Sequence, residues 1–508
     1  MEKEELIGKL LEQDVLISPE LLEGITEEET KRLLEGESED DILSSRREEE
    51  KVSAGSEPEK TPAAPAVRPP KMDETKEFPQ NSQVKIIHSY DKPSKKRTYQ
   101  DFVQHFRKRY TVLSAMLQER RELMGATSIS RILARREQEK TALIGMVTEK
   151  RITKNKNVIM KVEDLTGEIS VIATAKNPEA LRAAEDVVLD EVIGVVGSAS
   201  GDALFVDNII YPDVPSRELK CSPVEEYAIF IGDPQVGSKL FMKREFETML
   251  AWVCGEVGDE RQRAIAEKIR YIIIAGDLVE GVGVYPGQEE ELEIKDIKDQ
   301  YEVFAQYMKK LPEHIAIIAC PGNHDAGRIS EPQPPIYKDF AASVYALPNT
   351  TLISSPGTIN FGAKENFGGF NLLLYHGYSF IYYADNIPSI RNAGGLKAVD
   401  RIMQFLLQRR HLAPSHGSNR YIPDADEDPL IITTVPDFFI TGHVHRAAAA
   451  NYRNITMINA STWVDISDNE ERRGLEPQPA RLPIVNLKTR EVKIMNFYPG
   501  KKSEEATR

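Results

Sequence analysis

Five short clusters of Asp, Asn, Gln, His and Gly residues recur in the second half of the chain, each directly after an apolar run. In chain order the clusters are Asp233-Pro-Gln235, Gly276-Asp277, Gly322-Asn323-His324-Asp325, His376-Gly377 and Gly442-His443-Val444-His445. Each cluster is weak alone, because Gly-Asp after a strand is usually a turn and a lone histidine is usually a core or surface residue. All five together, each after an apolar run, indicate one shared site.

The residue types of these clusters predict a site for two divalent metal ions. Oxygen and imidazole ligands together suit Mn, Fe or Zn better than Ca. We expect Mn, with Fe, Zn or Mg as alternatives. A carboxylate can bridge two such ions, and a pair of ions ~3.5 to 4 Å apart stabilises both the attacking and the leaving oxygen of an in-line displacement. The chemistry that this favours is hydrolysis of phosphodiester bonds.

The apolar runs before the clusters predict strands that bring the polar residues together. The runs are YAIFIGD, YIIIAGD, HIAIIACPGNHD, FNLLLYHG and DFFITGHVH. Strands that present polar residues at their carboxyl ends are how layered α/β enzymes build their sites. Residues 224–500 are therefore expected to form one layered α/β domain.

The first half of the chain predicts three further parts and a connection. Residues 1–45 have helical periodicity and predict a small helical unit, whereas residues 46–97 are rich in Pro, Ala and charge and predict a disordered linker. Helical periodicity returns over 98–138. Over 139–215 the period changes to two, which predicts an all-β barrel, with an oligonucleotide-binding (OB) fold as the leading candidate.

The barrel could bind single-stranded nucleic acid or serve only for docking. Single-strand binding usually depends on aromatic side chains that stack on bases. The predicted strands offer only Phe205 and Tyr211. Docking is therefore the favoured interpretation.

Bulk properties limit the partners and the location of the chain. It has 508 residues and a formal net charge of −15, which is unusual for a free DNA-binding protein. Bound metals or a partner would have to supply positive charge. No run approaches the ~18 to 20 apolar residues of a membrane span. The charged N-terminus does not resemble a signal peptide, so we expect a cytoplasmic protein without membrane contact.

The ordered clusters resemble the calcineurin-like metallophosphoesterases, whose pattern is D-x-H, G-D, G-N-H-D/E, H and G-H-x-H. The longer stretches GDLVEGVGVYPGQEEELEIKDIKDQY and RRHLAPSHG, with the preceding barrel and tethered unit, resemble the small subunits of archaeal D-family DNA polymerases. This resemblance covers residues from about 99 to 500. It implies a two-metal 3′–5′ exonuclease that proofreads the DNA 3′ end beside a large catalytic polymerase subunit.

The resemblance also assigns ligands. One ion would be held by Asp233, Gln235, Asp277 and His445, and the other by Asp277, Asn323, His376 and His443, so that Asp277 bridges the two. His324 would lie outside this ligand set, where it could stabilise the phosphate or protonate the leaving oxygen. His324 and Asp277 are the expected catalytic residues.

One position departs from the family pattern, because Gln235 stands where a histidine is expected. An amide oxygen is a weaker ligand than imidazole for Mn, Fe or Zn. Either the first ion is held loosely, or the activity has decayed and the subunit is a scaffold for the polymerase. We favour retained activity, because the other ligand positions keep the expected types. A phosphoesterase acting on another nucleotide or on a phosphoprotein is a third interpretation, against which the barrel and tether argue.

Two further segments are candidates for substrate or partner contact. The loop around Tyr285 could cap a terminal base or simply be rigid. Basic residues between the fourth and fifth clusters could bind the DNA backbone or a partner subunit. These residues are Arg409, Arg410, His411, His416 and Arg420.

Overall fold

The computed structural model describes residues 84–93, 95–134, 139–467 and 476–498, together with Thr26 and Arg32. The chain divides into two units, Met1–Arg68 and Pro69–Arg508. The predicted helical unit and most of the predicted linker lie outside the described residues. Among the described residues, no helix is long and apolar enough to cross a membrane.

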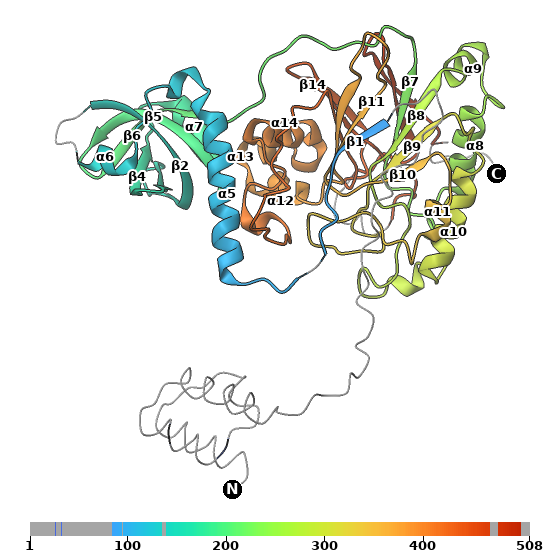
Figure 1. The fold of residues 1–508 in the computed structure, drawn as a ribbon, viewed down its shortest axis with the longest axis horizontal. Coiled ribbons are helices and arrows are strands. Elements are labelled where there is room, and N and C mark those ends of the chain that lie inside the picture. The colour runs from blue at the N-terminus through green and yellow to red at the C-terminus, as the bar shows by residue number, and fades with distance from the viewer. Residues whose placement is uncertain are drawn as a thin grey trace, which may run out of the picture. The chain divides into compact units, whose positions relative to one another are not determined.

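Two six-stranded sheets form the framework of the second half of the chain (Figure 1). The first sheet has the order β10 (Thr350–Leu352), β9 (Ala316–Ala319), β8 (Ile269–Ile274), β7 (Tyr227–Ile231), β16 (Arg481–Asn486) and β17 (Val492–Asn496). The second has the order β1 (Val84–Ser89), β11 (Gly357–Phe361), β12 (Phe370–Leu374), β13 (Phe438–Thr441), β15 (Ile455–Asn459) and β14 (Ala448–Tyr452).

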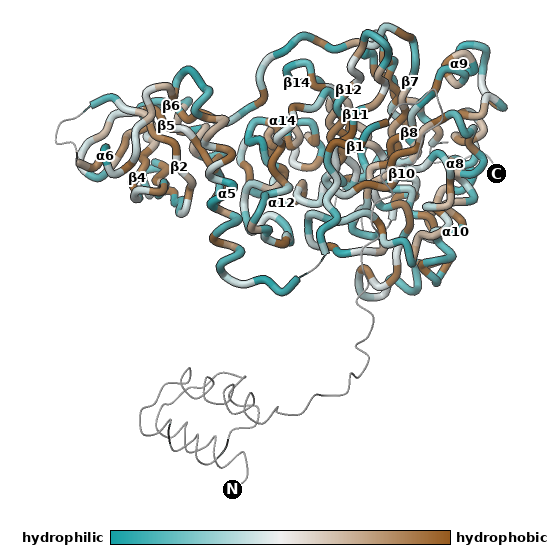
Figure 2. Tube along the Cα trace, in the orientation of Figure 1, coloured by the Kyte–Doolittle hydropathy of each residue, from teal (hydrophilic) through white to brown (hydrophobic). Residues whose placement is uncertain are grey.

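Alternating side chains of these strands fill different layers of the core. Ala228 and Phe230 of β7 pack with Phe438 and Ile440 of β13 in a cluster shared by both sheets. The intervening residues of β7 pack instead with helices on the outer face of the first sheet. Both faces of such strands are buried, which explains their continuous apolar sequence. Figure 2 shows the hydrophobic residues concentrated in the strands.

Helices cover the outer faces of both sheets. The first sheet packs against α8 (Lys243–Val253), α10 (Ile297–Met308) and α11 (Ala342–Tyr345). The second packs against α12 (Phe380–Asn386), α13 (Pro388–Asn392) and α14 (Val399–Arg409). The predicted layered α/β domain is therefore confirmed as mixed sheets between helices.

Residues 139–210 form a closed five-stranded barrel. Its strand order is β2 (Glu139–Ile152), β3 (Val158–Asp164), β4 (Gly167–Ala173), β6 (Ala203–Ile210) and β5 (Val192–Ser200), with helix α7 (Pro178–Asp186) between β4 and β5. Helix α5 (Tyr99–Gln118) precedes the barrel and begins with a capping box formed by Thr98 and Asp101. The shorter α6 (Ile129–Leu133) packs on the barrel.

The prediction of a disordered linker over residues 46–97 is wrong at the carboxyl end of that segment. Val84–Ser89 forms β1, which pairs antiparallel with β11 at the edge of the second sheet. Val84 is buried in the core shared by the sheets, with Ile86 packed against it. A six-residue edge strand inside a charged, Pro-rich stretch gives little period-two signal, so composition concealed it.

The predicted basic surface is also wrong for three of its five residues. Arg409, Arg410 and His411 are 3%, 6% and 0% exposed. The Arg409 guanidinium pairs with Glu191 of the barrel at 3.0 Å. Arg410 donates to the carbonyl of Ile432 at 2.7 Å. These cations therefore join parts of the chain and offer no surface to DNA.

Candidate metal centre

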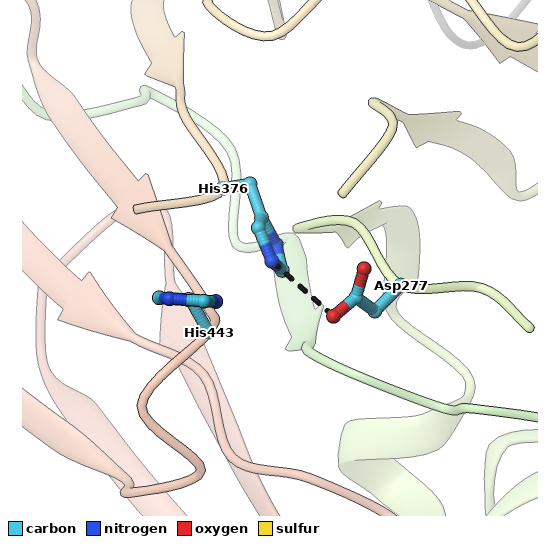
Figure 3. A group of neighbouring side chains, drawn as sticks. All are labelled: Asp277, His376 and His443. Carbon is cyan, nitrogen blue, oxygen red and sulfur yellow. Dashed lines mark ion pairs between the residues drawn. The ribbon is translucent and has the colours of Figure 1, made fainter. Parts of the chain in front are cut away.

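The carboxyl ends of the parallel strands place the predicted ligands together. Strands β7, β8 and β9 pair in parallel, as do β12 and β13. Asp277, His376 and His443, from loops after three different strands, bring ligand atoms within 4.8 Å of one another (Figure 3). The structure thus brings three of the predicted ligands together.

His376 is fixed in the orientation that a metal ligand needs. Its Nδ1 lies 2.7 Å from the carbonyl oxygen of Ala275, so this nitrogen donates a proton to the backbone. Its Nε2 lies 3.3 Å from Asp277 Oδ2 and 3.0 Å from Asn323 Oδ1. A backbone acceptor that fixes the tautomer is the usual support of a ligating histidine.

His324 adjoins this group without belonging to it. Its backbone N–H donates to Asp277 Oδ1 at 2.8 Å, and its Nδ1 lies 2.7 Å from the carbonyl oxygen of Glu280. Donation from Nδ1 leaves Nε2 as the nitrogen available to a substrate. The ring of Tyr285 lies edge-on to that of His324, with centroids 6.3 Å apart.

Asp233 joins the first and last clusters. Its carboxylate accepts from the backbone N–H of His443 at 3.0 Å, and Asp233 Oδ1 lies 3.8 Å from Nε2 of His445. Gln235 is 4% exposed and its backbone N–H donates to the carbonyl of Asp277 at 2.9 Å. The departure from the family pattern therefore lies at the site itself.

Five of the predicted ligands have left-handed backbone conformations that non-glycine residues rarely adopt. The φ angles are 46° at Asp233, 46° at Gln235, 50° at Asp277, 70° at His443 and 51° at His445. Such conformations cost about 1–3 kcal/mol each and persist where the surrounding structure imposes them. Their concentration at the predicted ligands indicates that the loops are shaped for binding.

Two motif glycines allow the loops to approach one another. A Cβ on Gly322 would lie 2.2 Å from Asp277 Oδ1, and one on Gly442 would lie 2.6 Å from Asp233 Oδ2. Neither distance is compatible with a side chain. The glycines beside the ligands therefore serve close packing of carboxylate against backbone.

The electrostatics of the site favour a bound cation. Burial would raise the pKa of Asp277, but His376 and His324 hold it well below its ordinary value. Burial lowers the pKa of His443 to about 3. Despite burial, the Asp277 carboxylate raises the pKa of His376 to about 10. Asp277 is thus charged and His443 neutral, the forms that coordinate metals, whereas His376 would have to release a proton when an ion binds.

A buried nitrogen without a hydrogen-bond partner is a further sign that these residues fit a divalent ion. The Nε2 of His443 is buried and has no hydrogen-bond partner among the described residues. A buried polar atom without a partner costs about 1–3 kcal/mol. Two imidazoles and a shared carboxylate are a donor set suited to Mn, Fe or Zn.

Asp325 and Tyr301 support the site in a way that the sequence did not reveal. The Asp325 carboxylate accepts from the N–H groups of Leu278 at 3.2 Å and Gly322 at 2.9 Å. It also accepts from the Tyr301 hydroxyl at 2.9 Å. Asp325 thereby ties the loop after β8 to the loop after β9. Its place in the third cluster was a signal for Asp325, whereas nothing in the sequence marked Tyr301.

Known proteins resemble most of the described chain. Residues 228–447 match the calcineurin-like phosphoesterase family, which implies binding of divalent metal. The DNA polymerase II small subunit of Methanocaldococcus jannaschii is 38% identical over 392 residues, which are 77% of this chain and 64% of that protein. This chain therefore spans less than two thirds of that relative.

Two further relatives are covered more fully. The DNA polymerase II small subunit of Methanothermobacter thermautotrophicus is 36% identical to this chain. The match covers 76% of this chain and 77% of that protein's length. The corresponding subunit of Archaeoglobus fulgidus is 35% identical over 76% of this chain and 75% of its own. A solved asparaginyl-tRNA synthetase from Pyrococcus horikoshii matches 16% of the chain with a TM-score of 0.15, too low to support an argument. The chain belongs to the DNA polymerase II small-subunit family, and its second half is a calcineurin-like phosphoesterase domain.

Proposed function

We propose that this chain is a metal-dependent 3′–5′ DNA exonuclease that works as the small subunit of a replicative polymerase. The observation that carries the proposal is the convergence of Asp277, His376 and His443, together with a buried His443 nitrogen that has no hydrogen-bond partner among the described residues. A purely structural cluster would satisfy that nitrogen within the protein.

The ligands divide into two sets. Asp233, Gln235, Asp277 and His445 would hold one ion, and Asp277, Asn323, His376 and His443 would hold the other. When bound, divalent ions would polarise the phosphate and make water an effective nucleophile at neutral pH. The protein contributes the fixed orientation of the ligands, through contacts such as that of His376 with Ala275.

His324 acts on the leaving oxygen. Its Nδ1 is committed to the carbonyl of Glu280, so Nε2 delivers a proton or a hydrogen bond to the substrate. General acid catalysis of this kind contributes roughly 10²- to 10⁴-fold. Replacing His324 therefore removes much of the rate while leaving the ligands in place.

The alternative is a scaffold subunit without activity, motivated by Gln235. Retained activity is favoured because the neighbouring ligands keep their types, tautomers and strained backbone. The amide oxygen of Gln235 is a weaker ligand than imidazole, so the first ion requires a higher metal concentration. Gln235→His then lowers the Mn²⁺ concentration needed for half-maximal activity. If neither the unchanged chain nor the Gln235→His variant shows nuclease activity, the scaffold interpretation is supported.

We propose that the barrel is an OB fold used for docking. Its strand order and the helix between β4 and β5 suit that fold. Tyr211 stacks on Arg409, with the guanidinium carbon 3.9 Å from the ring centroid, and so is committed internally. Phe205, 42% exposed, remains as an aromatic on the barrel surface. One exposed aromatic is a poor platform for single-stranded DNA.

The partner proposed is a large catalytic polymerase subunit, as the relatives' designation as small subunits suggests. The net charge of −15 supports this assignment. DNA must be held against that charge, and a larger subunit with basic surface would supply the attraction.

The test is a nuclease assay on end-labelled DNA with a 3′ mismatch, using the purified chain with and without the large subunit. We expect shortening from the 3′ end in Mn²⁺, loss in chelator and strong reduction in His324→Ala. No cleavage in excess Mn²⁺ with the large subunit present would refute the exonuclease and support the scaffold.

A further inference from the structure

A cavity of about 500 Å³ opens directly beside the candidate metal centre. His443, Val444, His445 and Arg446 line it on one side. On the other side it is lined by residues of α12, α13 and the short helix η3 (Gly395–Ala398). The cavity is thus continuous with two predicted metal ligands.

The size and the apolar part of the lining suit a small organic group. Pockets for small molecules and cofactors measure about 300–1,000 Å³. Ile381, Ala384, Leu396 and Val444 contribute apolar surface, and Ile381 is 44% exposed. A nucleobase with its sugar has this size and this mixture of apolar face and polar edge.

The cavity is lined by three basic and two acidic side chains, the latter being Asp385 and Glu476, although acidic residues outnumber basic ones in the chain as a whole. Arg391, Lys397 and Arg446 all line the cavity. Among the described residues, the hydrogen bond that the Arg391 side chain donates goes to a backbone carbonyl, that of Asp385, at 3.3 Å. Three cations beside a centre that cleaves phosphodiesters are suitably placed for phosphates on either side of the bond that breaks.

Glu476 forms ion pairs with two of these cations. Its carboxylate lies 2.6 Å from Lys397 Nζ and 3.8 Å from Arg446 Nη1. The side chains of Lys397 and Glu476 are 50% and 60% exposed. Exposed ion pairs contribute little free energy, so a phosphate can displace this carboxylate.

We propose that the cavity is a subsite for one unstacked nucleotide of a DNA strand, with Arg391, Lys397 and Arg446 binding the adjoining phosphates. Glu476 competes with the phosphate for Lys397 and Arg446. This inference rests on the proposed exonuclease function, and it names how the substrate is held.

A consequence is selectivity for frayed 3′ ends. A nucleotide that enters the cavity must first leave its stack and its base pair. That costs a few kcal/mol in a paired duplex and least at a mismatch. Mismatched ends therefore enter the site more readily, and the barrel need not recognise the mismatch.

The test is binding of a fluorescent single-stranded oligonucleotide with phosphorothioate linkages at its 3′ end, measured by anisotropy on the full chain in Mn²⁺. Arg391→Gln and Arg446→Gln should each weaken binding about five-fold or more. Each should also reduce the slope of log K against log salt by about 0.7, as for one lost phosphate contact. Glu476→Gln should strengthen binding, because it removes a carboxylate that pairs with two cations.

Arg244→Gln on α8 is the matched control, since Arg244 is exposed and lies on a helix of the other sheet. It should bind like the unchanged chain. Wild-type affinity in both cavity arginine variants, or weaker binding by Glu476→Gln, would overturn the subsite.

Digestion assays separate this inference from the proposed function. Oligonucleotide binding that follows the predicted pattern, in a chain that never cleaves DNA, would leave the subsite standing and refute the exonuclease. Normal digestion, with an unchanged KM in both arginine variants, would refute the subsite and leave the exonuclease standing.

Discussion

Tyr301→Phe tests whether the support around Asp325 maintains the metal centre. The Tyr301 hydroxyl donates to Asp325 at 2.9 Å and accepts from the N–H of Ala326 at 2.8 Å. Removing the hydroxyl leaves the Asp325 carboxylate and the Ala326 N–H each with one hydrogen-bond partner fewer in the protein interior. A buried group left unsatisfied costs about 1–3 kcal/mol, so we expect the free energy of unfolding to fall by that amount.

The same change should weaken metal binding. The segment that Tyr301 fixes includes Asn323 and His324, one proposed as a ligand and the other as the general acid. Loss of a residue that supports metal ligands typically costs 10- to 100-fold in affinity or activity. We therefore expect Mn²⁺ to bind about ten-fold more weakly by isothermal titration calorimetry, with a decrease in Tm of roughly 2–4 °C for each kcal/mol lost.

Tyr307→Phe is the control for this experiment. Tyr307 lies on the same helix, α10, and is 6% exposed, but no hydrogen bond of its hydroxyl is recorded among the described residues. Its substitution should change neither Tm nor affinity appreciably. If Tyr301→Phe matched this control in Mn²⁺ affinity, the argument that Asp325 and Tyr301 position the ligands would be refuted.

Two further predictions concern the ligand loops and the response to acid. Gly322→Ala should abolish tight Mn²⁺ binding in calorimetry, because its Cβ would lie 2.2 Å from Asp277 Oδ1, whereas Gly327→Ala, whose Cβ meets nothing within 4 Å, should bind normally. Burial and the Arg109 guanidinium lower the pKa of His411 to about 4 from 6.5. Between these two pH values His411 is protonated in the unfolded chain but neutral in the folded protein. The stability that depends on a neutral His411 is therefore fully present above about pH 6.5 and declines as the pH falls towards 4. Thermal unfolding between pH 7.5 and 4.5 should show a smaller acid-induced loss in His411→Asn, and an equal loss would contradict the assignment.

The candidate site was predictable because its determinants are local. Apolar runs that end in Asp277, His376 or His443 specify parallel strands, and parallel strands align their carboxyl ends. The adjacent glycines carried the same information. What local sequence could not give was the set of contacts between distant segments. Tyr301 is an ordinary helix residue until the fold brings its hydroxyl to Asp325.

The two wrong predictions, the basic surface and the carboxyl end of the linker, also result from contacts between distant segments. Arg409 and its neighbours were expected at the surface because arginine is seldom buried without a partner. Glu191, the partner of Arg409, lies in the barrel, far away in the sequence. Similarly, β1 shows no strand pattern of its own and is defined by its pairing with β11.

The pairing of β1 with β11 makes the phosphoesterase domain discontinuous. The chain contributes one edge strand to the second sheet, leaves to build α5 and the barrel, and only then supplies the rest of both sheets. The barrel is thus inserted within the phosphoesterase domain. A ribosome completes β1 long before its partner exists, so this contact closes late in synthesis. A protein truncated to begin at α5 would expose β11 as an open sheet edge, a surface prone to pairing with other chains.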